Sequence, residues 1–115
     1  MNEIEKKEAI ELLVQILQFP TISSTGPIDN SYNNCANWIL NQCKCIGLDV
    51  CIIEESLLNK PIIAAKWIGS DPNLPAIVLN SHYDVVPVIT ECWTVPAFEG
   101  FCKDGRIYGR GAQDM

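Results

Sequence analysis

The feature that most constrains the fold is an apolar run, Ala76-Ile77-Val78-Leu79, that leads directly into a polar tip carrying His82 and Asp84. Strands of a parallel sheet are apolar on both faces, and ligands gather beyond their carboxyl ends. The run therefore predicts a buried strand over Ala76–Asn80, with the only histidine of the chain at its reactive end.

His82 and Asp84 are two positions apart, and residues with this spacing project to the same face of an extended chain. The Asp84 carboxylate can then hydrogen-bond one imidazole nitrogen and leave the other as an electron-pair donor. A metal-binding histidine needs this arrangement. The same pair also fits a hydrogen-bonded loop histidine that binds no metal, and both interpretations stay open at this point.

Asp114 follows Gly109 and Gly111, two residues that allow tight backbone conformations. A carboxylate held in such a loop can bridge two metal ions about 3.5–4 Å apart, although it can also be a simple turn former. His82 and Asp114 would together be an incomplete site, because a catalytic zinc usually takes three protein ligands.

The other prominent side chains have structural explanations. We expect Trp93 and Phe98 to pack in the core or at its rim, and Arg106 and Arg110 to be solvated or paired with nearby acids. None of the six cysteines has CxxC spacing. Reduced thiols at apolar positions are therefore expected, which favours a cytoplasmic protein.

Length and charge exclude several classes of protein. The 115 residues suffice for one domain, and the net charge of −6 argues against nucleic-acid binding, which needs clustered basic residues. No apolar run approaches the roughly 20 residues of a membrane span, so no membrane association is expected. The acidic start of the chain lacks the layout of a secretory signal.

The order of hydrophobic patterns predicts an α/β fold with two helices followed by a mixed sheet. The expected elements are helices over Ile4–Phe19 and Ser31–Ile46, strands over Asp49–Glu54, Ile62–Ile68 and Ala76–Asn80, and a hairpin that turns at Asp104-Gly105. A parallel sheet needs helices on both faces, but the helices come only before the strands. We therefore expect an incomplete domain.

Two segments resemble the N-terminal part of the M20 family of zinc amidohydrolases and peptidases. The family carries an H-x-D-V-x-P motif at a strand end and, further along, a segment similar to Y-G/A-R-G-A-x-D. Here these segments are Ser81–Val88 and Tyr108–Met115. Trp93, Phe98 and Asp104–Tyr108 fall where the family has W, F and DG-x-(I/L)-Y, and the resemblance covers essentially the whole chain.

The resemblance implies a role for each site residue. His82 would ligate one of two zinc ions, the catalytic residue Asp84 would orient its imidazole, and Asp114 would bridge both ions. Tyr83 departs from the family, which often has Thr or a small residue there, and Pro96-Ala97-Phe98 replaces the common D-P-F. Either change could alter the wall of the cleft, but neither removes a ligand.

The resemblance also implies what lies outside the chain. In the family a glutamate general base, the remaining zinc ligands and a smaller dimer-forming domain lie downstream, so residues 1–115 would be the N-terminal part of a catalytic domain. Asn80–Val88 and Arg110–Met115 look most like the aminoacylases, which hydrolyse N-acyl-L-amino acids as homodimers. The alternatives are another M20 deacylase, an M20 dipeptidase, or a non-enzymatic fragment that binds a full-length partner.

With the base and most zinc ligands expected outside residues 1–115, the purified 115-residue chain should not hydrolyse N-acetyl-methionine. Detection of the released amino group measures this activity. Robust turnover by the chain alone would contradict the expectation.

Overall fold

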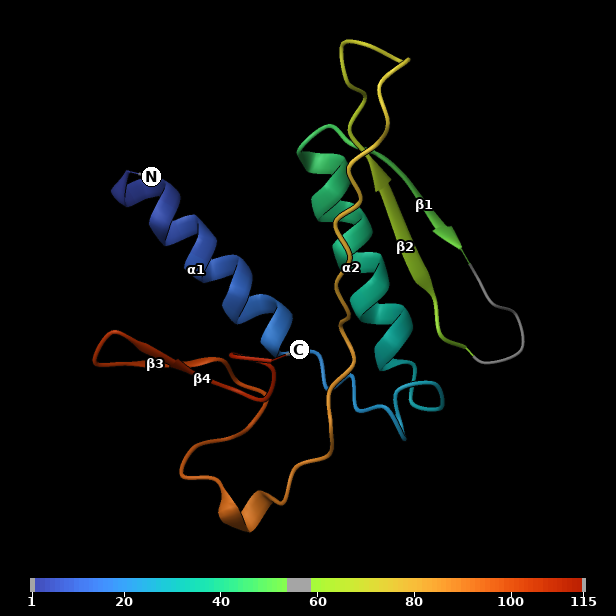
Figure 1. The fold of residues 1–115 in the computed structure, drawn as a ribbon. Coiled ribbons are helices and arrows are strands. Elements are labelled where there is room, and N and C mark those ends of the chain that lie inside the picture. The colour runs from blue at the N-terminus through green and yellow to red at the C-terminus, as the bar shows by residue number, and fades with distance from the viewer. Residues whose placement is uncertain (1, 54–58, 115) are drawn as a thin grey trace.

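The computed structural model describes residues 2–53 and 59–114 of the chain, which form an α/β arrangement (Figure 1). The elements are α1 (Glu3–Leu17), α2 (Ser31–Cys45), β1 (Asp49–Ile53), β2 (Ile62–Lys66), the 3₁₀ helix η1 (Thr90–Cys92), β3 (Phe101–Lys103) and β4 (Arg106–Tyr108). The predicted fold class, with two helices before the strands, is confirmed. None of the described helices is long and apolar enough to cross a membrane.

Helix α1 begins at a capping box. The Glu5 backbone N–H donates to Asn2 Oδ1 at 2.9 Å, and the Asn2 backbone N–H donates to Glu5 Oε2 at 2.8 Å. These reciprocal bonds satisfy two donors that the first helical turn leaves unpaired. The helix ends at Leu17, two residues before the predicted end, and Pro20 follows in the loop.

Helix α2 begins at Ser31, as predicted, but its cap differs from a simple Asn cap. Asn30 is the capping residue with a left-handed backbone (φ 68°), and its side chain makes no capping bond. The Asp29 carboxylate instead accepts from the Ser31 backbone N–H at 2.9 Å, and this bond lowers the pKa of Asp29. Gly47, at φ 81°, ends the helix as its position predicts.

Each sheet has two antiparallel strands, where the sequence predicts a mixed sheet. Strand β1 pairs with β2, and this sheet packs on α2. The hairpin β3–β4 turns at Asp104 and Gly105, both at positive φ (50° and 73°), as the Asp-Gly pair predicts. Glu54, the predicted last residue of the first strand, lies outside the described residues.

The strand predicted over Ala76–Asn80 does not form. The segment is extended, but no backbone hydrogen bond joins it to another described segment, and Ile77 and Leu79 are 91% and 92% exposed. A strand needs a neighbour that pairs with its backbone, and the described part of the chain places none beside this segment. The prediction of a buried strand is therefore wrong for this structure.

The core is small and lies between the end of α1, the start of α2 and Val85. Its apolar members are Leu17, Tyr32, Cys35, Ala36, Val85 and Ala97. The radius of gyration is 16.1 Å, against about 13 Å for a compact domain of this length. The arrangement is consequently open, with apolar surface on its outside.

The six cysteines are free, as predicted, but only Cys35 is buried. Burial raises the pKa of the Cys35 thiol to about 12. Cys45, Cys51, Cys92 and Cys102 are exposed, so the expectation that the thiols occupy apolar core positions is wrong for most of them.

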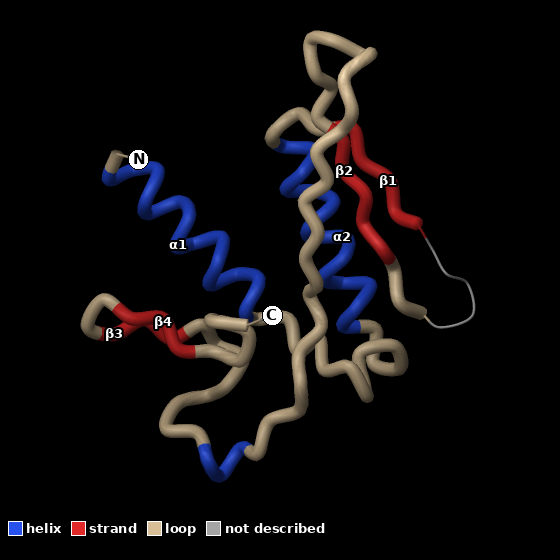
Figure 2. Tube along the Cα trace, in the orientation of Figure 1, coloured by secondary structure: helices blue, strands red, loops and turns tan. Residues whose placement is uncertain are grey.

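Residues Thr21–Ser23, here called the strap, pair with the segment that carries His82. Both stretches belong to the loops drawn in tan in Figure 2. The Val85 backbone N–H donates to the Thr21 carbonyl at 2.8 Å, and the Ser23 N–H donates to the Val85 carbonyl at 3.0 Å. Ile22 and Val85 form an isolated parallel bridge between these bonds. The buried Thr21 hydroxyl adds a third bond, to the Tyr83 carbonyl at 2.5 Å.

The Tyr83 side chain connects the same segment to the residues just before β2. Its hydroxyl donates to the carbonyl of Pro61, just before β2, at 2.6 Å. Its ring meets that of Tyr32 edge to face, with centroids 5.4 Å apart. Burial raises the pKa of Tyr83 to about 12.

We predict that Gly26→Ala lowers the free energy of unfolding by about 1–3 kcal/mol, because the added methyl group would overlap the ring of Tyr32. Urea denaturation measures the change. Gly69→Ala is the control, since its Cβ would meet no atom within 4 Å, and it should stay within about 0.5 kcal/mol of the parent. Equal stabilities of the two variants would contradict the packing argument.

We predict that Tyr83→Phe lowers the free energy of unfolding by about 0.5–1.5 kcal/mol, because it removes the bond to Pro61. Its effect should also depend on pH. The pKa of Tyr83 is 10.0 when unperturbed and about 12 when folded, so the folded chain keeps a proton that the unfolded chain has lost. Stability then falls as pH rises between about 10 and 12.

Denaturation curves over this pH range test the second part. The alkaline loss of stability should be smaller in Tyr83→Phe than in the parent chain. Tyr108→Phe is the control, because the hydroxyl of Tyr108 bonds to no described residue. An identical alkaline loss in Tyr83→Phe and the parent would refute the role of this phenol.

Candidate metal centre

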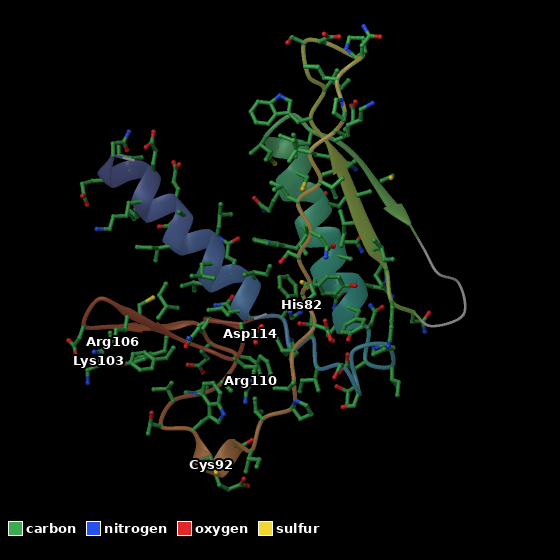
Figure 3. The ribbon with its side chains drawn as sticks, in the orientation of Figure 1. His82, Cys92, Lys103, Arg106, Arg110 and Asp114 are labelled. Atoms are coloured by element: carbon green, nitrogen blue, oxygen red, sulfur yellow. The ribbon has the colours of Figure 1, made fainter. Side chains whose placement is uncertain are left out.

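The structure brings together the three side chains that the sequence singles out. The His82 ring lies between the carboxylates of Asp84, two positions further along the chain, and Asp114, which is distant in the sequence. His82 and Asp114 are labelled in Figure 3. All three side chains are about half-exposed or more, and that of Asp114 is 94% exposed. A soluble ion can therefore reach them from solvent.

Asp84 engages Nδ1 of His82 twice. The distance from Nδ1 to Asp84 Oδ1 is 3.2 Å, and that to the Asp84 backbone carbonyl is 3.1 Å. Both contacts are with oxygen acceptors, which favours a proton on Nδ1 and a free electron pair on Nε2. The contact that the i, i+2 spacing predicts is therefore present.

Asp114 faces the other nitrogen of the same ring. Its Oδ1 lies 3.7 Å from His82 Nε2, which is too long for a hydrogen bond. Two ligands held about 2.0 Å from a tetrahedral zinc lie roughly 3.3 Å apart. The observed separation is close to that of two ligands sharing one ion, so the nitrogen and carboxylate donors fit zinc.

These two donors do not complete a site. Within the residues 2–53 and 59–114, no group of three or more His, Cys, Asp or Glu side chains is placed to hold a metal. A catalytic zinc with three protein ligands would need at least one more donor than His82 and Asp114.

The Asp114 turn is positioned by the loop before β3 and by the end of α1. The Arg110 backbone N–H donates to the Ala97 carbonyl at 2.7 Å, and the Ala112 N–H donates to the Gly109 carbonyl at 3.1 Å. A Cβ on Gly109 would lie only 3.2 Å from the Leu17 side chain. Glycine therefore allows the close approach of this turn to the helix.

Arg110 differs from its predicted role. Arg106 is exposed, as expected, but the Arg110 guanidinium pairs with no acid among residues 2–53 and 59–114. It lies over the Trp93 ring, 5.3 Å from the centroid, and its Nη2 is 3.5 Å from the Pro87 carbonyl. Trp93 and Phe98 are half-buried, in keeping with the predicted rim packing.

Sequence reasoning missed the contacts of Arg110 because they join separate segments. The motif places Arg110 near Asp114, but no local pattern shows that Trp93 and Pro87 come next to it. Trp93, Tyr108, Arg110 and Asp114 also line an open hollow of about 730 Å³. The hollow adjoins the candidate metal ligand and can admit a small molecule beside it.

Comparisons with known proteins agree with the resemblance. A model of Peptidase family M20/M25/M40 matches residues 78–115, the segment that contains His82, Asp84 and Asp114. Aminoacylase-1 of Pongo abelii is 56% identical over 112 residues, which are 96% of this chain and 26% of the relative. Aminoacylase-1 of Sus scrofa is 37% identical over 108 residues, 93% of this chain and 25% of the relative.

A third relative, the probable carboxypeptidase S-like 1 of Dictyostelium discoideum, is 41% identical over 63 residues, 55% of this chain and 13% of the relative. The chain spans about a quarter of the length of the aminoacylase-1 relatives that it matches. The family match covers both metal-ligand candidates, and the aminoacylase-1 similarity extends over nearly all of the chain. The chain thus belongs to the M20/M25/M40 peptidase family.

Proposed function

We propose that the protein containing this chain is a zinc-dependent hydrolase of N-acyl-L-amino acids. The observation that carries the proposal is the His82 ring, with Nδ1 held by Asp84 and Nε2 turned toward the Asp114 carboxylate. The similarity to proteins named aminoacylase-1 supports this substrate class over other amides. The products would be a carboxylate and a free amino acid.

Each of the three residues has a distinct proposed role. His82 binds zinc through Nε2, while Asp84 fixes the orientation of the ring through Nδ1. The Asp114 carboxylate would supply donor oxygens to both zinc ions. When bound, zinc lowers the pKa of water and polarises the carbonyl of the scissile amide.

We also propose that residues 1–115 are the N-terminal part of a catalytic domain. Ile77, Val78 and Leu79 are more than four-fifths exposed, which supports further polypeptide covering them. The missing zinc ligands, a glutamate general base and a dimer-forming domain would come from that polypeptide, and the complete protein would be a homodimer. The six free thiols support a cytoplasmic location.

An M20 peptidase is the second candidate function. The similarity to the probable carboxypeptidase S-like 1 favours it, since the matching region covers half of the chain. An M20 dipeptidase would accept substrates with a free α-amino group. An N-acyl-amino-acid hydrolase needs the acyl group instead, so paired substrates distinguish the two activities.

The test uses the full polypeptide that the gene encodes, purified with its metal. We predict about two zinc ions per chain, with hydrolysis of N-acetyl-methionine and little hydrolysis of the dipeptide Met-Met. His82→Ala and Asp114→Asn should lose zinc and activity. Asp84→Asn should weaken zinc binding about 10–100-fold, because the ring loses its charged partner.

Asp104→Asn is the matched control. Asp104 is exposed at the hairpin turn with φ 50°, a conformation that Asn tolerates. It removes the same charge without touching His82 and should keep full zinc content and activity. Hydrolysis of Met-Met alone would favour the peptidase, and a wild-type protein without zinc or turnover would favour the non-enzymatic alternative.

A further inference from the structure

Arg110 connects the two loops that carry the candidate zinc ligands. It lies four positions before Asp114 in the sequence, and its Nη2 reaches the carbonyl of Pro87, three positions after Asp84. Arg110 and Asp114 also line the same hollow, and both are labelled in Figure 3. The contact of Arg110 to Pro87 joins these two loops directly.

Two further contacts hold Arg110 in place. Its backbone N–H donates to the carbonyl of the buried Ala97 at 2.7 Å. Its guanidinium lies over the Trp93 ring at 5.3 Å, a geometry in which the cation is attracted to the aromatic face. Because its backbone is bound to Ala97 and its side chain to Trp93 and Pro87, Arg110 fixes the distance between the Ala97 and Pro87 segments.

Arginine at position 110 carries an energetic penalty that lysine would avoid. The Nε of Arg110 is buried and has no hydrogen-bond partner among the residues that the structure describes, and an unsatisfied buried donor is unfavourable. Lysine has no such group. However, the guanidinium places its Cζ over the Trp93 ring while a separate atom, Nη2, reaches the Pro87 carbonyl, and the single ammonium of lysine cannot divide these two contacts between different atoms.

We propose that Arg110 is a positioning residue that holds the His82 loop against the Asp114 turn and so sets the affinity of the site for zinc. The inference rests on the proposed function, in which His82 and Asp114 are ligands. Arg110 acts through these two residues and does not touch the ion. A change of a few tenths of an ångström in their separation would alter the fit to a shared ion, because the ligand distances around zinc are narrowly defined.

The test compares Arg110→Met, Arg110→Lys and the control Arg106→Met in the full polypeptide. Arg106 is exposed at the start of β4, so its replacement removes the same charge away from both loops. Zinc affinity is measured by competition with a chelator, at a temperature where circular dichroism shows every variant to be folded. We expect Arg110→Met to bind zinc at least about tenfold more weakly, as for other residues that orient metal ligands.

Arg110→Lys should restore part of the affinity, because it keeps a donor for Pro87 but loses the guanidinium that lies over the Trp93 ring. Arg106→Met should bind zinc as the wild type does. Folded Arg110→Met protein with wild-type zinc affinity would overturn the proposal. A merely structural role predicts that outcome, since it lowers stability but leaves the affinity of the folded protein unchanged.

A second measurement does not need zinc. In metal-free protein, hydrogen exchange of residues 83–88 and 109–114 should be faster in Arg110→Met than in Arg106→Met, with no change in α2. Unchanged exchange at both loops would refute the positioning role. If the wild type binds no zinc, the proposed function fails, while the exchange comparison still decides whether Arg110 holds the loops together.

Discussion

The pairing of the strap Thr21–Ser23 with Tyr83–Val85 is the contact on which the rest of the structure depends. Backbone bonds in both directions and the buried Thr21 hydroxyl join the loop after α1 to the segment that carries His82. Each such bond contributes about 0.5–1.5 kcal/mol net. The preceding residues, 75–82, make no backbone bond to another described segment. The strap therefore supplies the backbone bonds that place the His82 loop, and the side chains of Tyr83 and Arg110 add to them.

The end of α1 helps to position both the His82 loop and the Asp114 turn. On one side it continues into the strap that holds Val85, and on the other Leu17 packs closely on the backbone of Gly109, ahead of Asp114. The distance between the two candidate ligands therefore depends on how two loops pack against a single helix end. Because the core there is small, a single contact between the loops strongly affects the distance between His82 and Asp114.

The charge distribution suits a cation. The chain has a net charge of −6, and two carboxylates lie within 4 Å of the only imidazole. Carboxylates gathered in this way attract a divalent ion and are stabilised by it. The positive charge of Arg110 is directed to Trp93 and Pro87, so it contacts neither Asp84 nor Asp114 and does not neutralise the site.

The sequence by itself determined the local features: the helix that ends before Gly47, the hairpin at Asp104-Gly105, and the contact of His82 with Asp84. These depend on residues a few positions apart, whose geometry follows from backbone preferences. Only the tertiary structure decided that Ala76–Asn80 is unpaired, that Asp114 faces His82, and that Arg110 lies on Trp93. Such features depend on which distant segments pack together, and hydrophobic pattern alone does not specify the partner of a strand or of a charged side chain.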